Sequence, residues 1–338
     1  VYREGSYLLT SGQEEPRTPE IGHALGLVPR DRVRDADSYY LYDEVFDRLH
    51  ELGGLAGYAH QAETFHGYRG LTLDGLRGKI DVLEILQFCA EEGPLAVRHY
   101  YHLLNLGVPV TATAGSDFPW CGKGHRYGVE NAPADPAQIG NVRFYTHVGS
   151  PFSYARWRTA LKAGETFVSS GPVVDLRVEG RRPGAHLRLE GGDSVRVRIE
   201  ARGHPEQVPL SRLELIGHGE VLARAGPEES GQTRSALAID TTLHPEHGVW
   251  LAARTRARDL QVAHTTPVYV HVGGEGFHHP DSARVLLDRS AAYLEEIDSV
   301  SARPHPDPGR HAHRYRDGLL RRIETTRAVI DSLRRVLD

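Results

Sequence analysis

The chain has 338 residues, a net charge of −5 and no large basic block, which makes nucleic acid a poor candidate for a partner. Its apolar share of 39% and charged share of 25% are typical of a globular protein, and its length predicts about two domains. No run approaches the roughly 18 apolar residues that a membrane helix needs. Because the chain begins at Val1 and contains no methionine, we expect a further segment to precede it.

Strand and helix signals alternate over the first 150 residues. Residues 43–52 place four apolar side chains on one helical face, and two glycines follow directly. Strands separated by helices predict a parallel sheet or a barrel. The other elements expected here are strands at 7–10, 55–59, 80–86 and 108–114, and a helix at 94–107.

The pattern changes near residue 150. A helix at 153–164 precedes short alternating strands that are separated by glycine and proline turns, as in an antiparallel sandwich. We expect Trp250 and Tyr269 to lie in its core. The terminal helix at 314–337 either mediates dimerisation or covers an apolar face. A homo-oligomer is therefore one of the two assemblies that the sequence allows. The domains expected are a βα portion (1–150), a β-sandwich with a leading helix (151–277) and a helical segment (278–338).

Metal-binding side chains follow the predicted strands of the first domain. Because parallel βα folds gather their sites at the C-terminal ends of strands, these side chains are expected to converge. Imidazole and carboxylate ligands suit zinc, manganese or iron, and such an ion lowers the pKa of a bound water to about 7. The candidate ligands are Glu14, His60, Glu84 and Asp117 at strand ends, and His23 in a predicted turn at 22–23.

Three of the candidate ligands also have a structural interpretation. His60 alone is typical of a hydrogen-bonded surface residue, Asp117 of a helix N-cap, and Glu84 of an ion pair with an arginine. Metal-binding residues at the ends of four strands nevertheless favour a shared site. The prediction depends on Glu14, His23, His60 and Asp117 meeting in one pocket.

Other polar residues near this site are candidates for catalysis and substrate binding. His66, His125 and Lys123 are candidates for the general acid. Arg126 and Arg143, together with Lys123, would stabilise an anionic substrate or transition state, although each alone is typical of solvated surface charge. The sequence has no GxGxxG, P-loop or GxSxG motif, so a dinucleotide enzyme or a serine hydrolase is not indicated.

At these residues the sequence resembles the polymerase-and-histidinol-phosphatase (PHP) superfamily of metallohydrolases. It is most similar to the carbaryl-hydrolase-like (CehA/McbA-type) branch. The resemblance extends roughly over residues 5 to 290. The matching stretches are 12–14, 22–23, 59–60, 81–84, 114–117, 143–148, 160–172 and 263–274.

The resemblance implies a distorted (βα)7 barrel that holds two or three divalent metal ions. The chain would contain the C-terminal part of this barrel, followed by the antiparallel sandwich and the C-terminal helices. By similarity, Glu14 would be a bridging carboxylate, His23 and His60 would be imidazole ligands, and Asp117 would bind metal and orient the attacking water.

The sequence departs from the PHP pattern at two places. Residues 1–13 lack the opening His-x-His of the family, and Pro119 stands where a histidine is common; His125 is a candidate replacement. We therefore expect a metal-dependent hydrolase of small molecules, acting on an ester, carbamate, amide or phosphoester bond. The alternative is a non-catalytic binding or scaffold protein with a degenerate site.

Overall fold

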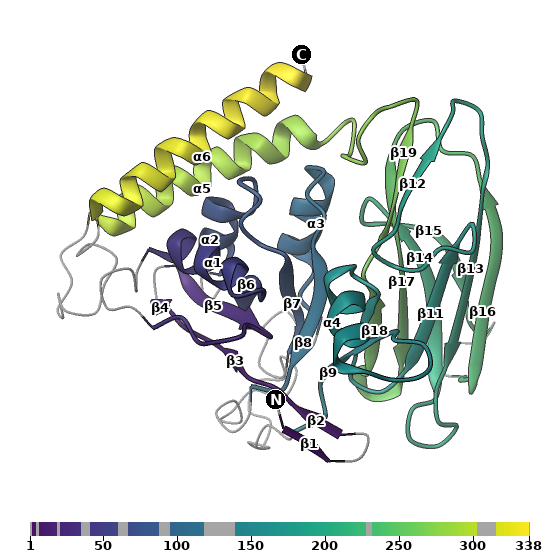
Figure 1. Ribbon diagram of the computed structural model, residues 1–338. Helices are drawn as coiled ribbons and strands as arrows, with labels where there is room; N and C mark the ends of the chain where they lie inside the picture. Colours follow the sequence, from purple (N-terminus) through teal and green to yellow (C-terminus); the bar gives the residue numbers. More distant parts are fainter. Residues whose placement is uncertain are drawn as a thin grey trace. The chain divides into compact units, whose positions relative to one another are not determined.

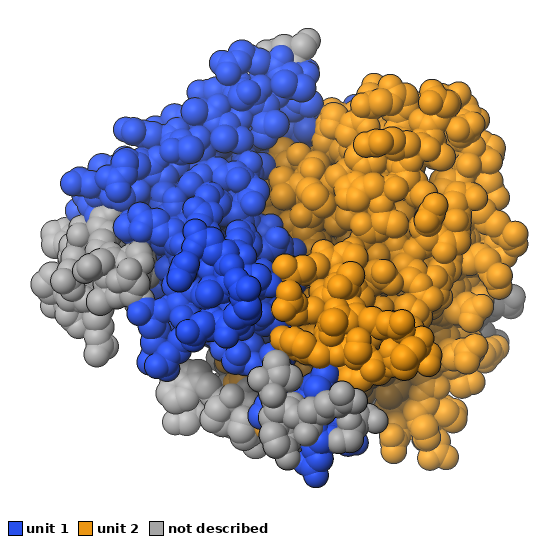
Figure 2. Space-filling model, in the orientation of Figure 1, with its two compact units in different colours: residues 1–84, 281–338 blue, residues 85–280 orange. Residues whose placement is uncertain are grey.

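The computed structural model divides into two compact units, which Figure 1 labels by element and Figure 2 colours separately. Unit 1 comprises residues 1–84 and 281–338, and unit 2 comprises residues 85–280. None of the described helices is long and apolar enough to cross a lipid bilayer. The structure describes residues 2–4, 7–18, 21–34, 41–59, 67–87, 95–117, 139–227, 232–302 and 316–337.

Unit 1 contains a mixed sheet. β5 is antiparallel to β3, β4 and β6, whereas β6 and β7 are parallel. β7 begins in unit 1 and continues into unit 2. The strands of unit 1 are β3 (Gly12–Gln13), β4 (Arg17–Thr18), β5 (Gly22–Leu27), β6 (Leu55–Ala59) and β7 (Val82–Gln87), beside a hairpin of β1 (Tyr2–Glu4) and β2 (Tyr7–Leu9).

Helices α1 (Tyr42–Glu51) and α2 (Gly67–Asp74) pack against β5 and β6. The Tyr58 ring of β6 stacks on Tyr42 at 6.0 Å between centroids and meets Phe46 edge-on at 5.3 Å. Gly70 allows α2 to approach this ring, because a Cβ there would lie 2.3 Å from it. The helices therefore cover the sheet face that carries Tyr58.

The C-terminal helices α5 (Ala283–Ser301) and α6 (Arg316–Leu337) also belong to unit 1. Each buries one face, and both pack against α2. Arg322 of α6 donates to Asp74 of α2 at 2.6 Å, and both side chains are buried. A buried ion pair thus joins two segments that are 248 residues apart in the sequence.

Unit 2 is rich in strands. β12, β19, β17, β18, β10 and β9 form a sheet in that order, with β14 paired to β17 and β15, and β11, β13 and β16 form a second sheet. Most pairs are antiparallel, but β12 and β19 are parallel. The strands are β8 (Thr111–Gly115), β9 (Arg143–Thr146), β10 (Thr166–Ser169), β11 (Val173–Val178), β12 (His186–Leu189), β13 (Val195–Arg202), β14 (Leu210–Gly217), β15 (Glu220–Ala225), β16 (Ala236–Leu243), β17 (Val249–Ala257), β18 (Val262–Thr265) and β19 (Val268–Val272). The helices are α3 (Arg98–Asn105), α4 (Tyr154–Lys162) and the short η2 (Arg258–Leu260).

The two strand-rich sheets of unit 2 share one apolar core, in a sandwich-like arrangement. β13 alternates buried and exposed residues along its whole length, as a strand with one face in a core does. Its inward residues pack with Leu176 of β11, Leu215 of β14 and Leu251 of β17. Trp250 and Tyr269 are buried, as the sequence predicted.

The predicted fold class, with residues 1–150 as part of a (βα)7 barrel, is wrong. The described part of the chain is mostly strands in open sheets, and the sheet around β6 has the order β3-β5-β6-β7-β8, with β4 also paired to β5. Residues 22–27 form a strand, β5, that the sequence did not predict. Because β5 runs antiparallel to β6, the all-parallel pairing of a barrel is broken there. Alternation of strands and helices along a chain does not specify the direction in which strands pair.

Candidate functional site

A carboxylate and an imidazole meet in unit 1. His23 Nδ1 lies 2.7 Å from Glu14 Oε1, and both side chains are partly exposed. A histidine whose ring nitrogen bonds a carboxylate has its orientation and its tautomer fixed. His23 belongs to β5, so the predicted turn at 22–23 is wrong.

The register of the sheet places Glu84 on the same face as His23. His23 pairs with Ala59, and Tyr58 pairs with Leu83, so the next residues on the parallel strands, Ala59 and Glu84, are neighbours. Side chains of laterally paired residues point to the same face of a sheet. His23, Ala59 and Glu84 therefore form a row across β5, β6 and β7. We call these three residues and Glu14, which bonds His23, the acid–histidine row.

The antiparallel direction of β5 produces this row. The start of β5 lies beside the end of β6, so His23 lies next to Ala59, the last residue of β6. Adjacent strands lie about 4.8 Å apart, so the alanine methyl group occupies the middle of a row roughly 10 Å wide. Tyr58 points to the opposite face, toward α1, so the row lies on the face that α1 does not cover.

The donor set of the acid–histidine row fits a divalent cation in its chemistry. Two carboxylates and one imidazole are ligands of zinc, manganese and iron. Within the described ranges, however, no three His, Cys, Asp or Glu side chains are grouped closely enough to hold a metal ion. His60 follows Ala59 directly in the sequence but lies outside the described residues.

Asp117 and Arg143, two further candidates, belong to unit 2. Asp117 follows β8, is partly buried, and has a left-handed backbone with a φ of 50°. Aspartate tolerates this conformation better than most residues do. Arg143 of β9 donates from Nε to the Tyr145 hydroxyl at 2.7 Å and also bonds the Gly140 carbonyl. Arg143 is thus engaged with its own strand and the preceding turn.

The remaining predicted site residues fall outside the described part of the chain. They are His60, predicted as a metal ligand, His66 and His125, predicted as catalytic, and Lys123 and Arg126, predicted to bind substrate.

A second histidine–carboxylate pair in unit 1 has a structural role. His50 Nε2 lies 2.7 Å from Asp81 Oδ2, the same separation as in the Glu14–His23 pair. Asp81 also accepts from the Ala56 backbone N–H at 2.8 Å, which ties α1 and β6 to the start of β7. The hydrogen bond to Asp81 raises the pKa of His50. His50 therefore serves as a control for His23, because its ring bonds a carboxylate at the same distance but outside the acid–histidine row.

Sequence reasoning missed a polar group in unit 2. His147 follows β9, Glu165 precedes β10, and Arg182 follows β11, and all three line one cavity. They come from segments whose proximity depends on sheet pairing, which spacing along the chain does not show. The stretches at 143–148, 160–172 and 263–274 were singled out in the sequence and contain His147, Glu165 and Thr265, but nothing in them marked these residues as one group.

Comparisons with known proteins give no family for the chain. No protein-family profile matches it, and no curated protein matches it. Three solved structures show limited similarity. A fibronectin(III)-like module of Clostridium thermocellum CbhA is 13% identical over 29% of this chain and 93% of its own, with a TM-score of 0.21. A lytic polysaccharide monooxygenase of Jonesia denitrificans is 16% identical over 27% of this chain and 60% of its own, with a TM-score of 0.18.

The third structure, an engineered protein, is 12% identical over 70% of this chain and 60% of its own, with a TM-score of 0.17. TM-scores this low support no argument about fold or function.

Proposed function

We propose that this chain is a metal-dependent hydrolase that acts on an ester, carbamate, amide or phosphoester bond of a small molecule. The observation that carries the proposal is the acid–histidine row, in which Glu14 bonds His23 at 2.7 Å and Glu84 shares the face of His23. A bound divalent ion would supply Lewis-acid activation of water and of the substrate.

Within this proposal, Glu14 acts mainly by positioning His23. Its carboxylate accepts a hydrogen bond from the His23 Nδ1–H, which leaves Nε2 as the nitrogen that would bind a cation. Glu84 would supply a carboxylate ligand from β7, where it is 8% exposed.

Metal analysis of the purified chain tests the proposal. After supply of zinc or manganese and removal of loosely bound ions, we expect at least one ion per chain by mass spectrometry of the elements. His23→Gln and Glu84→Gln should each lower the bound metal, because each removes a ligand. His50→Gln is the matched control, since it breaks a pair of equal length outside the row and should leave the metal content unchanged.

A hydrolysis screen completes the test. The metal-loaded chain should cleave at least one class among aryl carbamates, aryl esters, anilides and aryl phosphates, and the variants that lose metal should lose this activity. Substoichiometric metal in the unmodified chain, or equal losses in His23→Gln and His50→Gln, would contradict the proposal. That result would favour the non-catalytic alternative.

A further inference from the structure

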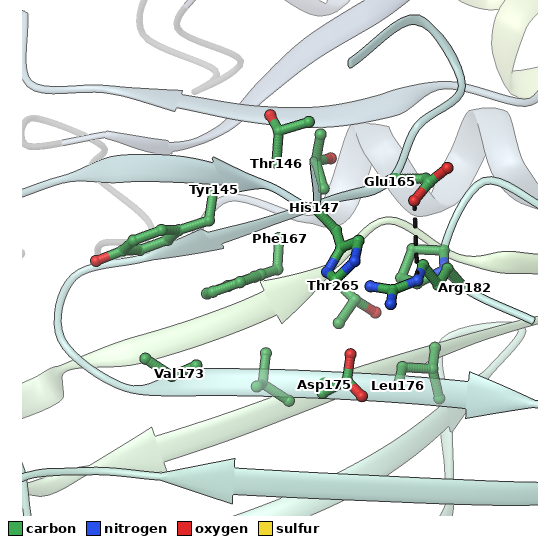
Figure 3. Close-up of a pocket in the computed structure, with 13 residues that line it drawn as sticks. Tyr145, Thr146, His147, Glu165, Phe167, Val173, Asp175, Leu176, Arg182 and Thr265 are labelled. Carbon is green, nitrogen blue, oxygen red and sulfur yellow. Dashed lines mark ion pairs between the residues drawn. The ribbon is translucent and has the colours of Figure 1, made fainter. Parts of the chain in front are cut away.

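A cavity of about 310 Å³ lies in unit 2 (Figure 3). Three strands of one sheet supply one wall, because Tyr145 of β9 pairs with Phe167 of β10, and Phe167 pairs with Thr265 of β18. β11 of the other sheet supplies Val173 and Asp175. Small-molecule sites in proteins begin at about this volume, so the cavity suits a ligand of one or two rings.

One end of the cavity is aromatic and apolar. The Tyr145 and Phe167 rings stack with their centroids 4.7 Å apart and their planes 13° apart. Val173 is 48% exposed, so an apolar surface is accessible from solvent at this end. Aromatic rings pack favourably against other rings beyond what burial alone provides. This end therefore suits the ring of a ligand.

The other end of the cavity is polar. In Figure 3, His147 and Arg182 lie to one side of the Phe167 ring, near Glu165. The His147 backbone N–H donates to the Glu165 carbonyl at 2.9 Å, which fixes the two segments together. Arg182 Nε lies 4.0 Å from Glu165 Oε2, at the outer limit of an ion pair. A guanidinium with so distant a partner retains donors for a second anion.

The charges around His147 favour an anion at this end. Burial lowers the pKa of His147, Arg182 lowers it further, and Glu165 opposes Arg182 by a smaller amount. Burial and the nearby Arg177 also lower the pKa of Arg182, whereas Asp175 and Glu165 raise it by smaller amounts. Asp175 is engaged by Arg177 at 2.9 Å. The positive charges therefore act more strongly on His147 than the carboxylates do.

We propose that this cavity binds a small aromatic carboxylic acid, with its ring against Phe167 and Val173 and its carboxylate on the Arg182 guanidinium. Arginine is the side chain best suited to a carboxylate, because its planar fork donates two parallel hydrogen bonds. A neutral alcohol would leave this fork without a charged acceptor, and an amine would meet Arg182 as a like charge. The inference is independent of the metal site in unit 1.

Calorimetry on the full chain tests the proposal with four probes. Benzoate supplies the ring and the carboxylate, acetate only the carboxylate, benzyl alcohol only the ring, and benzylamine a ring with the opposite charge. We expect benzoate to bind at least about tenfold more tightly than each of the other three, since one charge-assisted hydrogen-bonding group is worth about this factor.

Variants identify the residues that bind benzoate. Arg182→Gln should weaken benzoate binding at least about tenfold and leave benzyl alcohol unchanged. Arg181→Gln is the matched control, because the neighbouring Arg181 is exposed and does not line the cavity. Val173→Tyr should block benzoate by filling the aromatic end without altering any charge. Thermal unfolding of each variant verifies that it is folded.

Three results would overturn the proposal. The first is that the folded chain shows no measurable benzoate binding. The second is that Arg182→Gln and Arg181→Gln weaken benzoate binding equally. The third is that benzyl alcohol or benzylamine binds as tightly as benzoate. The last result would show an apolar slot without selectivity for an acid.

Discussion

Units 1 and 2 both bury a charged carboxylate, but they do so in different ways. In unit 1, Asp74 is fully buried and accepts from Arg322 of the C-terminal helix α6 and from Tyr58, both at 2.6 Å. In unit 2, Glu214 of β14 is 1% exposed and meets Arg254 of β17 at 2.8 Å and arginines of β14 and β15 at longer distances.

The two arrangements differ in what they hold together. β14, β15 and β17 already pair through their backbones, so the Glu214 cluster satisfies a charge within a formed sheet. α2 and α6 share no such ladder, and the Asp74–Arg322 pair, together with the hydrogen bond from the Thr326 hydroxyl to the Leu73 carbonyl, joins α6 to α2. We infer that unit 1 depends on long-range ion pairs, of which Asp74–Arg322 is more deeply buried than Arg69–Glu296, whereas unit 2 depends on its apolar core.

The chain offers separate probes for the two units. All three tryptophans in the sequence lie within residues 85–280, so tryptophan fluorescence reports on unit 2. The two longest helices, α5 and α6, lie in unit 1, so circular dichroism at the helical minimum reports largely on unit 1. Urea titrations followed by both signals can distinguish damage to one unit from damage to the other.

The largest effect is expected from Arg322→Met. Loss of this guanidinium leaves buried Asp74 without its closest cation and with only Arg77 at 3.5 Å, and breaking such a buried pair costs about 3–5 kcal/mol of unfolding free energy. The dichroism midpoint in urea should fall more than the fluorescence midpoint. Arg327→Met is the control, because its partner Glu295 is exposed and such surface pairs contribute about 0–1 kcal/mol. Equal effects of the two substitutions would refute the dependence of unit 1 on the Asp74–Arg322 pair.

A cavity in the core should damage unit 2 in the opposite pattern. Leu215→Ala removes a fully buried side chain from the core between the two sheets, at a cost of about 2–5 kcal/mol. The fluorescence midpoint should fall more than the dichroism midpoint. If both signals move together here and for Arg322→Met, the two units unfold as one and the comparison fails.

Acid should destabilise unit 2 through His264. Burial lowers the pKa of His264 to about 3, against 6.5 for an unperturbed histidine. His264 Nδ1 donates to the Thr265 carbonyl at 2.7 Å, so the neutral ring accepts at Nε2 from the Tyr101 hydroxyl at 2.6 Å. Below pH 6.5 the unfolded chain therefore binds a proton that the folded chain does not bind.

Unfolding free energy should consequently decrease as pH falls from 6.5 toward 3, by up to about 1.4 kcal/mol per pH unit from this group. Urea titrations by fluorescence at several pH values measure the slope. His264→Gln should reduce this slope, and the partly buried His218, whose pKa burial lowers to about 4, contributes part of the remainder. An unchanged slope in His264→Gln would exclude this histidine as a source of the acid sensitivity.

The smallest effect is expected at the start of α4. The Ser153 side chain accepts from the Arg156 backbone N–H at 3.2 Å, which caps the helix. Ser153→Ala should lower the unfolding free energy by about 1 kcal/mol, while Ser153→Asp should retain the cap. Calorimetric melting of the three proteins decides this, and a loss as large in Ser153→Asp as in Ser153→Ala would argue against capping.

Local elements were predictable because local patterns determine them. The strand at 55–59 was predicted with the bounds of β6, and the helix predicted at 43–52 is α1 at Tyr42–Glu51. β5 was missed because its sequence, GHALGL, has two glycines and weak apolar character. This one strand changed the fold class, since its antiparallel pairing is incompatible with the predicted barrel.

The candidate site was predictable only in part. Residue chemistry singled out Glu14, His23 and Glu84, and sheet register is what gives Glu84 and His23 a common face. The cavity beside Phe167 and Arg182 left no trace in the spacing of the sequence, because it depends on two sheets facing each other.

The sequence by itself determined most of the strands and helices, although not β5, and which of their faces are apolar, since periodicity and turn residues act over a few neighbours. Only the tertiary structure decided the direction of β5, the docking of α6 on Asp74 and the meeting of Phe167 with Arg182. Those outcomes depend on packing and charge pairing between residues that are distant along the chain, and local propensities contain no information about such partners.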